Sequence, residues 1–497
     1  MVSIEKQDVN RSEWMTLIIL SCLGLIVLFD EMMILPAIPD FVRDFNISYS
    51  TSSWLLSAYI IAAAVMTPIG GKLADIYGKK KILLIVVGVY ITGVLAGRFA
   101  DNIEVMLAAR AAQGVGMASF PIAFGIIREV FPEKKLALGQ TIFSSMFPAG
   151  AVVGLVGGAA IIQNYGWQAT FLAVLPVSIA LWLIIAKFVR VPSSMPMEAK
   201  AEAGNSNPPN DRTIDIKGTL ALAATIILFL TGITFLESND AGSWYQVAAL
   251  FAASGSSLAA FIAIEKRARS PLLDFKLMKD RNFLPPTIIL MLTFLSIFTV
   301  YLTVPIMVRS PEPLGFGGDA LAVASVQLPF MIVFMVGTIM SGFILNKIKN
   351  TKLTMIGTAV STIGFFFLLM FHSTEILVSV GLTILAAGLS LSITGGFNVI
   401  IISVPMQMTG IALGMTLLLN LVGMSVGPVF AGIIQQMYQG TVEGVEGQFP
   451  TQDAYNLIFV TAAFVSLASA ALALAVSRRK AAPQIVAESA PKTEEKS

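Results

Sequence analysis

The sequence has one cysteine, one histidine and few charged side chains. In 497 residues, Cys22 is the only cysteine, His372 is the only histidine, and Asp, Glu, Lys and Arg together make up 12%. A lone cysteine cannot form a disulfide within the chain. These two residues, with no clustered carboxylates beyond Asp30 and Glu31, provide neither the ligands of a metal centre nor the groups of a hydrolytic site. We therefore expect no metal site and no enzymatic activity.

Two other absences exclude further classes. The net charge is only +2, without the large basic excess of a nucleic-acid-binding protein. The sequence also lacks a GxxxxGK[ST] phosphate loop, a motif that binds the phosphates of ATP. We expect no nucleic-acid partner, no cofactor and no ATP-driven activity on this chain.

Long hydrophobic runs fill most of the chain instead. Hydrophobic residues make up 56% of it and the mean hydropathy is +0.81, whereas about 25% of a soluble protein is charged. A helix that crosses about 30 Å of hydrocarbon needs about 20 mostly apolar residues. The sequence therefore predicts a protein of the lipid bilayer with fourteen spans. They are 14–36, 50–70, 82–98, 105–127, 138–162, 168–189, 217–236, 245–264, 283–308, 320–345, 353–371, 376–402, 409–436 and 454–477.

The basic residues give these spans an orientation. On one side the loops contain only Arg43, Arg98 and Arg309, and Arg110 lies within a span; the rest of the 32 Lys and Arg residues lie on the side of the termini. Cytoplasmic loops carry the excess of Lys and Arg. We predict a multi-pass protein of the cytoplasmic membrane with both termini inside. The first run is too long for a signal peptide, so we expect it to be retained.

A short loop between the second and third spans combines glycines, an acid and a basic run. The segment 71–81 reads GKLADIYGKKK. Glycine permits a tight turn and a close backbone approach. A carboxylate such as Asp75 is favoured near the start of the next helix, where backbone N–H groups are free. An alternative is that this is an ordinary short cytoplasmic loop, which is basic in most membrane proteins.

This loop resembles the signature loop of the major facilitator superfamily. Residues 107–118 (LAARAAQGVGMA) are similar to the fourth-helix motif of that superfamily, with Arg110 and Gln113 at matching positions. Residues 30–39 (DEMMILPAIP) resemble the first-helix motif of its drug:proton antiporters, and residues 265–283 resemble the loop before the ninth helix of the fourteen-span branch. The resemblance implies an all-α integral membrane protein with a major facilitator fold, in which two six-helix bundles flank two inserted helices.

The resemblance also implies a domain organisation. Residues 191–216 and 478–497 have the composition of a flexible linker and a disordered tail. The expected parts are a cytoplasmic N-tail (1–13), a six-helix bundle (14–190), the linker (191–216), two inserted helices (217–264), a cytoplasmic loop (265–282), a second six-helix bundle (283–477) and the C-tail (478–497). Internal echoes agree, because GAVVG at 150–154 is repeated as GMSVG at 423–427. Such GxxxG spacings favour close helix packing.

The function implied is secondary active transport. We expect proton-coupled efflux (antiport) of lipophilic or cationic small molecules by alternating access, driven by the proton gradient, in a protein that works as a monomer. The gating loop at the cytoplasmic end is predicted to use Gly71, Asp75, Gly78, Lys79 and Lys80. One alternative is an importer or facilitator of a specific metabolite, because the fifth helix lacks the Gly-Pro pair of drug antiporters at Gly154. A non-transporting membrane sensor or an enzyme is a more distant alternative.

Three charged side chains are predicted at membrane depth, namely Asp30, Glu31 and Arg110. Such a charge costs roughly 2.5–3.5 kcal/mol on insertion scales and is usually paired or functional. Asp30 and Arg110 each lie about six residues from the outer end of their spans, so we expect them at the same depth. We predict proton coupling at these three residues; the alternative is a purely structural pair of Asp30 and Arg110. Glu31 lies about 100° around the helix from Asp30, and the sequence leaves open which acid faces the cavity.

A substrate cavity is predicted between the two bundles. Aromatic and methionine side chains suit a tolerant apolar site, and a buried amide is expected to find an interior partner. Taken singly, each candidate could also be ordinary helix packing. The predicted lining is Tyr59, Gln113, Phe120, Met146, Gln327, Asn398 and Asn420.

Overall fold

The computed structural model describes residues 9–191, 216–235, 243–267, 275–344, 348–404 and 409–478. The described residues therefore leave out most of the predicted N-tail, linker and C-tail, and part of the predicted loop 265–282. The sequence GFILNK at 342–347 also resembles the 71–81 segment, and its last three residues lie outside the described residues.

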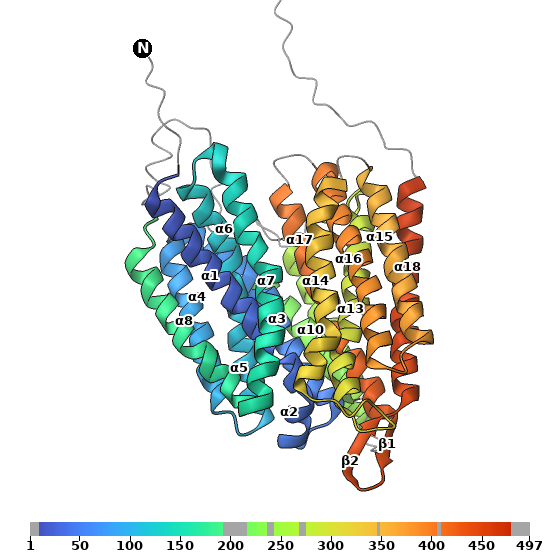
Figure 1. The fold of residues 1–497 in the computed structure, drawn as a ribbon. Helices are drawn as coiled ribbons and strands as arrows, with labels where there is room; N and C mark the ends of the chain where they lie inside the picture. The colour runs from blue at the N-terminus through green and yellow to red at the C-terminus, as the bar shows by residue number, and fades with distance from the viewer. Residues whose placement is uncertain are drawn as a thin grey trace, which may run out of the picture.

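The first half of the chain forms one bundle of helices, drawn in blue to green in Figure 1. Three short helices interrupt the long ones: η1 (Leu35–Ala37), α2 (Ile38–Asp44) and η2 (Val115–Ala118). The long helices are α1 (Arg11–Met33), α3 (Tyr49–Tyr77), α4 (Lys79–Arg98), α5 (Ile103–Gly114), α6 (Ser119–Val130), α7 (Glu133–Tyr165) and α8 (Gln168–Phe188).

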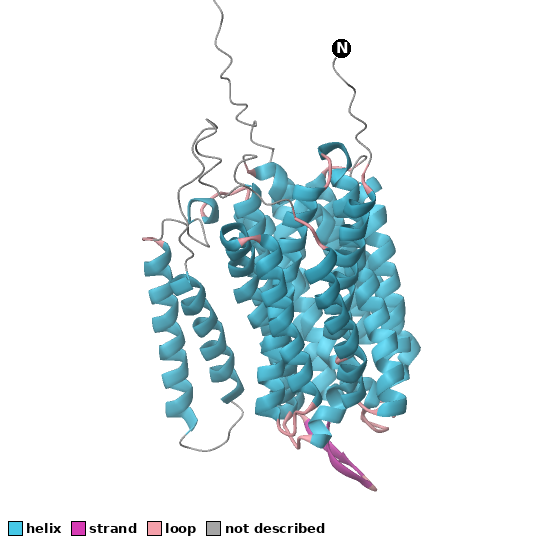
Figure 2. Cartoon of the chain, turned by 90° about the vertical axis from the view of Figure 1, so that its left-hand side faces the viewer, coloured by secondary structure: helices cyan, strands magenta, loops and turns pink. Residues whose placement is uncertain are grey.

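The last part of the chain forms a second bundle, drawn in yellow to red in Figure 1. Between the bundles in sequence come α10 (Ile216–Phe235), α11 (Ser243–Glu265) and the short α12 (Phe275–Met278). Figure 2 shows α10 and α11 as a separate pair beside the bundles, where α10 contacts α3 and α17. The second bundle contains α13 (Leu284–Arg309), α14 (Ala320–Ile344), α15 (Asn350–Met370), α16 (Glu375–Ser403), α17 (Thr409–Met437), the strands β1 (Gln439–Val442) and β2 (Val445–Pro450), and α18 (Gln452–Arg478).

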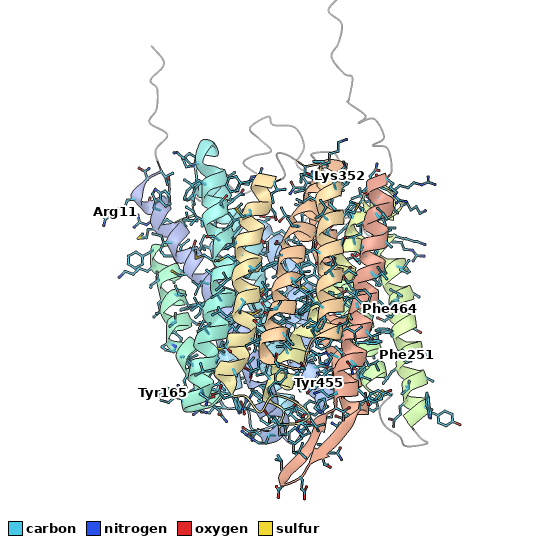
Figure 3. All side chains as sticks on the ribbon, turned by 45° about the vertical axis from the view of Figure 1, so that its right-hand side comes forward. Arg11, Tyr165, Phe251, Lys352, Tyr455 and Phe464 are labelled. Carbon is cyan, nitrogen blue, oxygen red and sulfur yellow. The ribbon has the colours of Figure 1, made fainter. Side chains whose placement is uncertain are left out.

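The two ends of the molecule differ. We call the end where α1 begins and α18 ends the terminal end, and the end that carries β1 and β2 the hairpin end (Figure 1). Figure 3 places Arg11 and Lys352 at the terminal end and Tyr165 and Tyr455 toward the hairpin end. The antiparallel hairpin was not predicted, because the sequence analysis assigned no structure to the residues between the spans 409–436 and 454–477.

Glycines let two pairs of helices approach closely, as the GxxxG spacings predicted. A Cβ atom on Gly154 of α7 would lie 2.6 Å from the Phe29 carbonyl oxygen of α1, and one on Gly158 would lie 2.6 Å from the Met33 Cα. In the second bundle, a Cβ on Gly427 of α17 would lie 2.8 Å from the Leu295 carbonyl oxygen of α13. The predicted close packing is confirmed. The pairs α1–α7 and α13–α17 also correspond to each other, as expected for repeated halves.

Twelve helices among the described residues are long and apolar enough to cross a membrane. The predicted count of fourteen is not reproduced by this criterion. The predicted span 105–127 is divided into α5, η2 and α6, because the chain forms a tighter 3₁₀ helix at Val115–Ala118. The predicted span 217–236 coincides with α10, whose apolar part, Lys217–Gly232, is shorter than the twelve. The chain is a multi-pass membrane protein whose membrane-crossing elements are all helices.

The two bundles are joined at the hairpin end. There α3 packs against α17 and α7 packs against α14. The Tyr49 N–H donates a hydrogen bond to Gln436 Oε1 at 3.0 Å, and the Ser57 hydroxyl donates to the Ser425 carbonyl at 2.9 Å. These contacts place α3 at the centre of the junction between the bundles.

An ion pair adds to this junction. Arg309, at the end of α13, binds Asp40 of α2 with both terminal nitrogens, one of them at 2.8 Å. It also donates to the Pro36 carbonyl at 2.9 Å. The sequence analysis treated Arg309 only as a loop charge, because its partner lies 269 residues away and no local pattern links the two.

Candidate functional site

Asp30 and Arg110 lie together inside the first bundle. Asp30 is in the last turn of α1 and Arg110 is in α5, and both side chains are fully buried. Arg110 Nη1 lies 3.7 Å from Asp30 Oδ2. The prediction that the two charges share a depth is confirmed, and they form an ion pair that is too long for a hydrogen bond.

Arg110 is held mainly by partners other than Asp30. Its Nε donates to the Leu55 carbonyl of α3 at 3.1 Å, and its Nη1 donates to Gln113 Oε1 at 2.6 Å. The guanidinium also lies over the Tyr59 ring, 4.5 Å from its centroid. The predicted residues Gln113 and Tyr59 therefore surround Arg110, with 0% and 1% exposure. The charge of Arg110 is positioned without requiring an ionised Asp30.

Asp30 keeps both of its oxygens available. Neither oxygen has a hydrogen-bond partner among the described residues, and the same is true of Arg110 Nη2. A buried carboxylate is usually satisfied by several donors, because an unpaired buried charge is costly. Asp30 can therefore gain or lose a proton without breaking a hydrogen bond, which is the chemical property that a proton-carrying site needs.

Glu31 is buried beside Asp30. It is 6% exposed, whereas Asp30 is 0% exposed. Both acids interact electrostatically with Arg110 and with Tyr59. The prediction that left open which of the two acids faces the cavity therefore stays open.

The segment 71–81, predicted as a loop, forms the end of α3 and the start of α4 with only Gly78 between them, and it ties several helices of the first bundle together. Lys79 Nζ lies 3.2 Å from Asp75 and 2.6 Å from Glu129 of α6. Lys80 Nζ donates to the Ala186 carbonyl of α8 at 2.7 Å. The sequence analysis did not single out Glu129, although an acid at the end of the fourth span facing a basic loop was a usable signal.

Two glycines shape this loop, and one predicted placement is wrong. Gly78 has a φ of +98° and separates α3 from α4, and Gly71 lies against Pro121, where a Cβ would be at 3.7 Å. Asp75 does not sit at the start of the next helix, as predicted, but in the last turn of α3. The helix continues beyond its apolar residues until Gly78 ends it, so the side chain of Asp75 is 70% exposed.

Two of the predicted cavity residues of the first bundle, Phe120 and Met146, lie at an aromatic cluster. The Phe120 ring of α6 stacks on Phe147 of α7, with centroids 4.3 Å apart, and its centroid is 5.9 Å from that of Phe143. Met146 is half-buried on α7, next in sequence to Phe147. This cluster provides an apolar, adaptable surface.

The predicted residues of the second bundle are not brought to one place. Gln327 is 2% exposed and borders a cavity of about 10 Å³, room for about one water molecule, together with Tyr301 and Phe330. Asn398 donates only to the Thr394 carbonyl of its own helix, at 2.8 Å. The expectation that each amide finds an interior partner is wrong for Asn420, because both of its polar atoms lack one among the described residues. A larger groove of about 400 Å³ between α14 and α16 contains none of the predicted residues.

The structure combines two helix bundles of matching internal packing with the buried pair of Asp30 and Arg110. These two features indicate the class of membrane protein to which the chain belongs. Repeated halves with a polar site near their interface are characteristic of membrane transporters. The chain belongs to the Major Facilitator Superfamily, whose family model matches residues 20–428.

The relatives of the chain include drug exporters. The multidrug resistance protein Stp of Mycobacterium tuberculosis is 24% identical over 443 residues, which cover 87% of this chain and 78% of that protein. The multidrug efflux pump LfrA of Mycolicibacterium smegmatis is 26% identical over 447 residues, or 88% of this chain and 84% of that protein. Among solved structures, the nucleoside transporter NupG superposes with a TM-score of 0.63 over 95% of this chain and 100% of that one, at 14% identity. The chain is a transporter of this superfamily with multidrug-efflux relatives.

Proposed function

We propose that the protein exports lipophilic or cationic small molecules from the cytoplasm in exchange for protons. The observation that carries the proposal is the buried Asp30, which faces Arg110 at 3.7 Å and keeps two free oxygens. The names of the relatives Stp and LfrA support the substrate class. The proton gradient is the energy source, and no cofactor takes part.

The proposal includes fourteen membrane spans, as in the fourteen-span antiporter branch. The interrupted segment from α5 to α6 runs from Ile103 to Val130, and α10 has 20 residues. At 1.5 Å per residue, each is about 30 Å or longer, which matches the hydrocarbon thickness. An even count agrees with the beginning of α1 and the end of α18 at one end of the molecule (Figure 1). The excess of basic residues assigns that terminal end to the cytoplasm.

The junction at the hairpin end corresponds to one state of an alternating-access cycle. If that end faces outward, the Asp40–Arg309 ion pair and the contacts of α3 with α17 close the outer side. Export then requires these contacts to break while the terminal end closes. The 71–81 loop is the proposed gate of the terminal end, where Lys79 holds α3 to α6 through Asp75 and Glu129.

Asp30 couples this cycle to protons. A proton that reaches Asp30 from the outside neutralises its charge and weakens the attraction of the site for a cationic substrate. Arg110 keeps its bonds to the Leu55 carbonyl and Gln113 in either state, so protonation does not dismantle the bundle. Release of the proton to the cytoplasm restores the carboxylate and the affinity for a new substrate.

Efflux from cells tests this function. Cells that express the protein are loaded with ethidium, and efflux is compared for the wild type and Asp30→Asn, with and without a protonophore. We expect protonophore-sensitive efflux that is lost in Asp30→Asn. Glu104→Gln is the matched control, because Glu104 is an exposed acid in the first turn of α5. Protonophore-insensitive efflux, or full efflux by Asp30→Asn, contradicts the proposal.

A second candidate, an importer or facilitator of a specific metabolite, is favoured by one observation. The fifth span, α7, lacks the Gly-Pro pair that drug antiporters carry there, because Gly154 is followed by Leu155. A Gly-Pro pair occurs instead in α17, at Gly427 and Pro428. Accumulation rather than depletion of the substrate in expressing cells identifies this alternative.

A further inference from the structure

We infer that the groove between α14 and α16 binds one phospholipid whose headgroup carries a primary amine, with the amine at Glu375 and one acyl chain along the groove. The inference does not depend on the proposed export function, because it concerns the lipid-facing surface of the second bundle and not the path of the substrate. Three observations carry it: a groove that opens to the bilayer, an acid at its end without a cationic partner, and free hydrogen-bonding groups in its wall.

The groove follows the contact between α14 and α16, which pack side by side (Figure 1). Its volume is about 400 Å³, within the range of about 300–1,000 Å³ that is usual for ligand sites. Ser325, Val326 and Pro329 of α14 form one wall, and residues between Glu375 and Ile384 of α16 form the other. This stretch of α16 is about 14 Å long, close to half of the roughly 30 Å of bilayer hydrocarbon. The groove therefore has the length of an acyl chain segment within one leaflet.

Exposed apolar side chains surround the groove. Leu321 and Ile332 of α14 are exposed, and so are Ile376 and Val380 of α16, which line the groove itself. Leu321 lies four residues before Ser325 and Ile332 lies seven after it, so the three share one face of α14. In a protein of the bilayer, an exposed apolar face contacts lipid. The groove is therefore open to the bilayer, and a lipid is the molecule that can enter it.

Glu375 lies at the end of this groove, in the first turn of α16. A Cβ atom on Gly318 would lie 3.1 Å from Glu375 Oε1, so the carboxylate lies against the segment that leads into α14. The Gly318 N–H does not bind it, because this group donates to the Val308 carbonyl at 2.8 Å. Among the described residues, the Glu375 carboxylate has neither a hydrogen-bond donor nor an ion-pair partner. The acid is therefore available to a ligand.

The basic side chains at the hairpin end are placed elsewhere. Arg43 and Arg309 both pair with Asp40, and Arg98 lies in the last turn of α4, in the first bundle. His372, three residues before Glu375, has its Nδ1 hydrogen-bonded to a carbonyl of α15 at 2.8 Å. The negative charge at the end of the groove is thus left without a counter-charge in the described part of the chain. Charge complementarity favours a cationic headgroup.

The wall of the groove fits the remaining parts of such a headgroup. Pro329 lies within α14 and has no N–H, so the Ser325 carbonyl lacks its helical donor and can accept a hydrogen bond. The Ser379 hydroxyl forms no hydrogen bond among the described residues, and the free backbone N–H groups that begin α16 favour a phosphate. A primary ammonium donates N–H groups to these acceptors, whereas a trimethylammonium group has none to donate. The ligand class is a phospholipid such as phosphatidylethanolamine.

Photocrosslinking of the purified full-length protein tests the inference. The protein is placed in nanodiscs of phosphatidylcholine and phosphatidylglycerol, with a trace of phosphatidylethanolamine that carries a diazirine in its acyl chain, and the modified peptides are located by mass spectrometry. We expect adducts concentrated on the groove residues of α14 and α16. Added unlabelled phosphatidylethanolamine should suppress them, whereas the same amount of extra phosphatidylcholine should not.

Two variants separate the charge from the shape of the groove. Glu375→Gln should lower the adduct yield about threefold or more, and Glu375→Asp should recover part of it. Asp453→Asn is the matched control, because Asp453 is an exposed acid in the first turn of α18 at the same end of the molecule. Val380→Trp fills the groove and should lower the adducts of a phosphatidylcholine probe as well.

Three results would overturn the inference. They are adducts spread evenly over the lipid-facing helices, equal suppression by phosphatidylcholine and phosphatidylethanolamine, and an unchanged yield in Glu375→Gln. No transport is measured, so a failure of the export proposal leaves this test intact and is recognised separately.

Discussion

Breaking the ion pair between Asp40 and Arg309 should open the hairpin end of the transporter. The two side chains are 9% and 19% exposed, and Arg309 makes two bonds to Asp40 and one to the Pro36 carbonyl. An exposed ion pair contributes about 0.2–1 kcal/mol, and a hydrogen bond to a charged group contributes about 1.5–3 kcal/mol. For this largely buried pair we expect about 1–2 kcal/mol, which is a factor of about 5–30 in the equilibrium between closed and open states.

The assay uses a single reporter cysteine. Ser57→Cys in a Cys22→Ser background places a thiol where α3 meets α17, at a position that is fully buried in this state. In intact cells, labelling by a membrane-impermeant maleimide reports opening toward the outside. Asp40→Asn should raise the labelling rate about 5–30-fold. Arg43→Ala is the matched control, because Arg43 lies 3.3 Å from Asp40 but is 72% exposed.

Two results would refute this reasoning. One is unchanged labelling in Asp40→Asn protein that is inserted in the membrane at normal levels. The other is failure of the charge-exchanged pair, Asp40→Arg with Arg309→Asp, to restore slow labelling.

Three further predictions concern other contacts of the structure. Arg110→Ala should destabilise the protein by about 3–5 kcal/mol, since it leaves a buried carboxylate without its counter-charge; thermal unfolding in detergent measures this, and adding Asp30→Asn should recover part of the loss. Gly154→Leu should lower the unfolding temperature, because overpacking costs about 1–3 kcal/mol where α7 touches α1; an unchanged temperature would contradict the packing. Lys79→Ala and Glu129→Gln should each slow transport, and the double variant should be no slower than either single one; additive effects would show that the two residues act separately.

Local patterns were sufficient to predict the helices and the central charge pair. Apolar runs located the long helices, and counting residues from the span ends placed Asp30 and Arg110 at one depth, as their 3.7 Å separation confirms. The repeated GxxxG spacing predicted close contact in both bundles. These features depend on composition and helical period, which a single sequence displays directly.

The features that were missed depend on contacts between distant segments. The Asp40–Arg309 pair joins residues 269 apart. Lys79 and its partner Glu129 in α6 are 50 residues apart, and the acid at the end of the fourth span was a signal that the sequence analysis did not use. Asp75 was placed one helix too late, because the apolar run ends several residues before α3 does. Which of Asp30 and Glu31 faces the cavity was not predicted, since a helical period gives relative angles but no external reference.

The most direct test of the central claim is transport in liposomes that contain the purified protein. A pH gradient is imposed across the liposome membrane, and accumulation of tetraphenylphosphonium is followed for the wild type and Asp30→Asn, beside exchange of labelled for unlabelled substrate without a gradient. We predict gradient-driven accumulation by the wild type, and for Asp30→Asn a loss of accumulation with slower exchange that no longer depends on pH. Accumulation that persists in Asp30→Asn, or wild-type transport that ignores the gradient, would contradict the account.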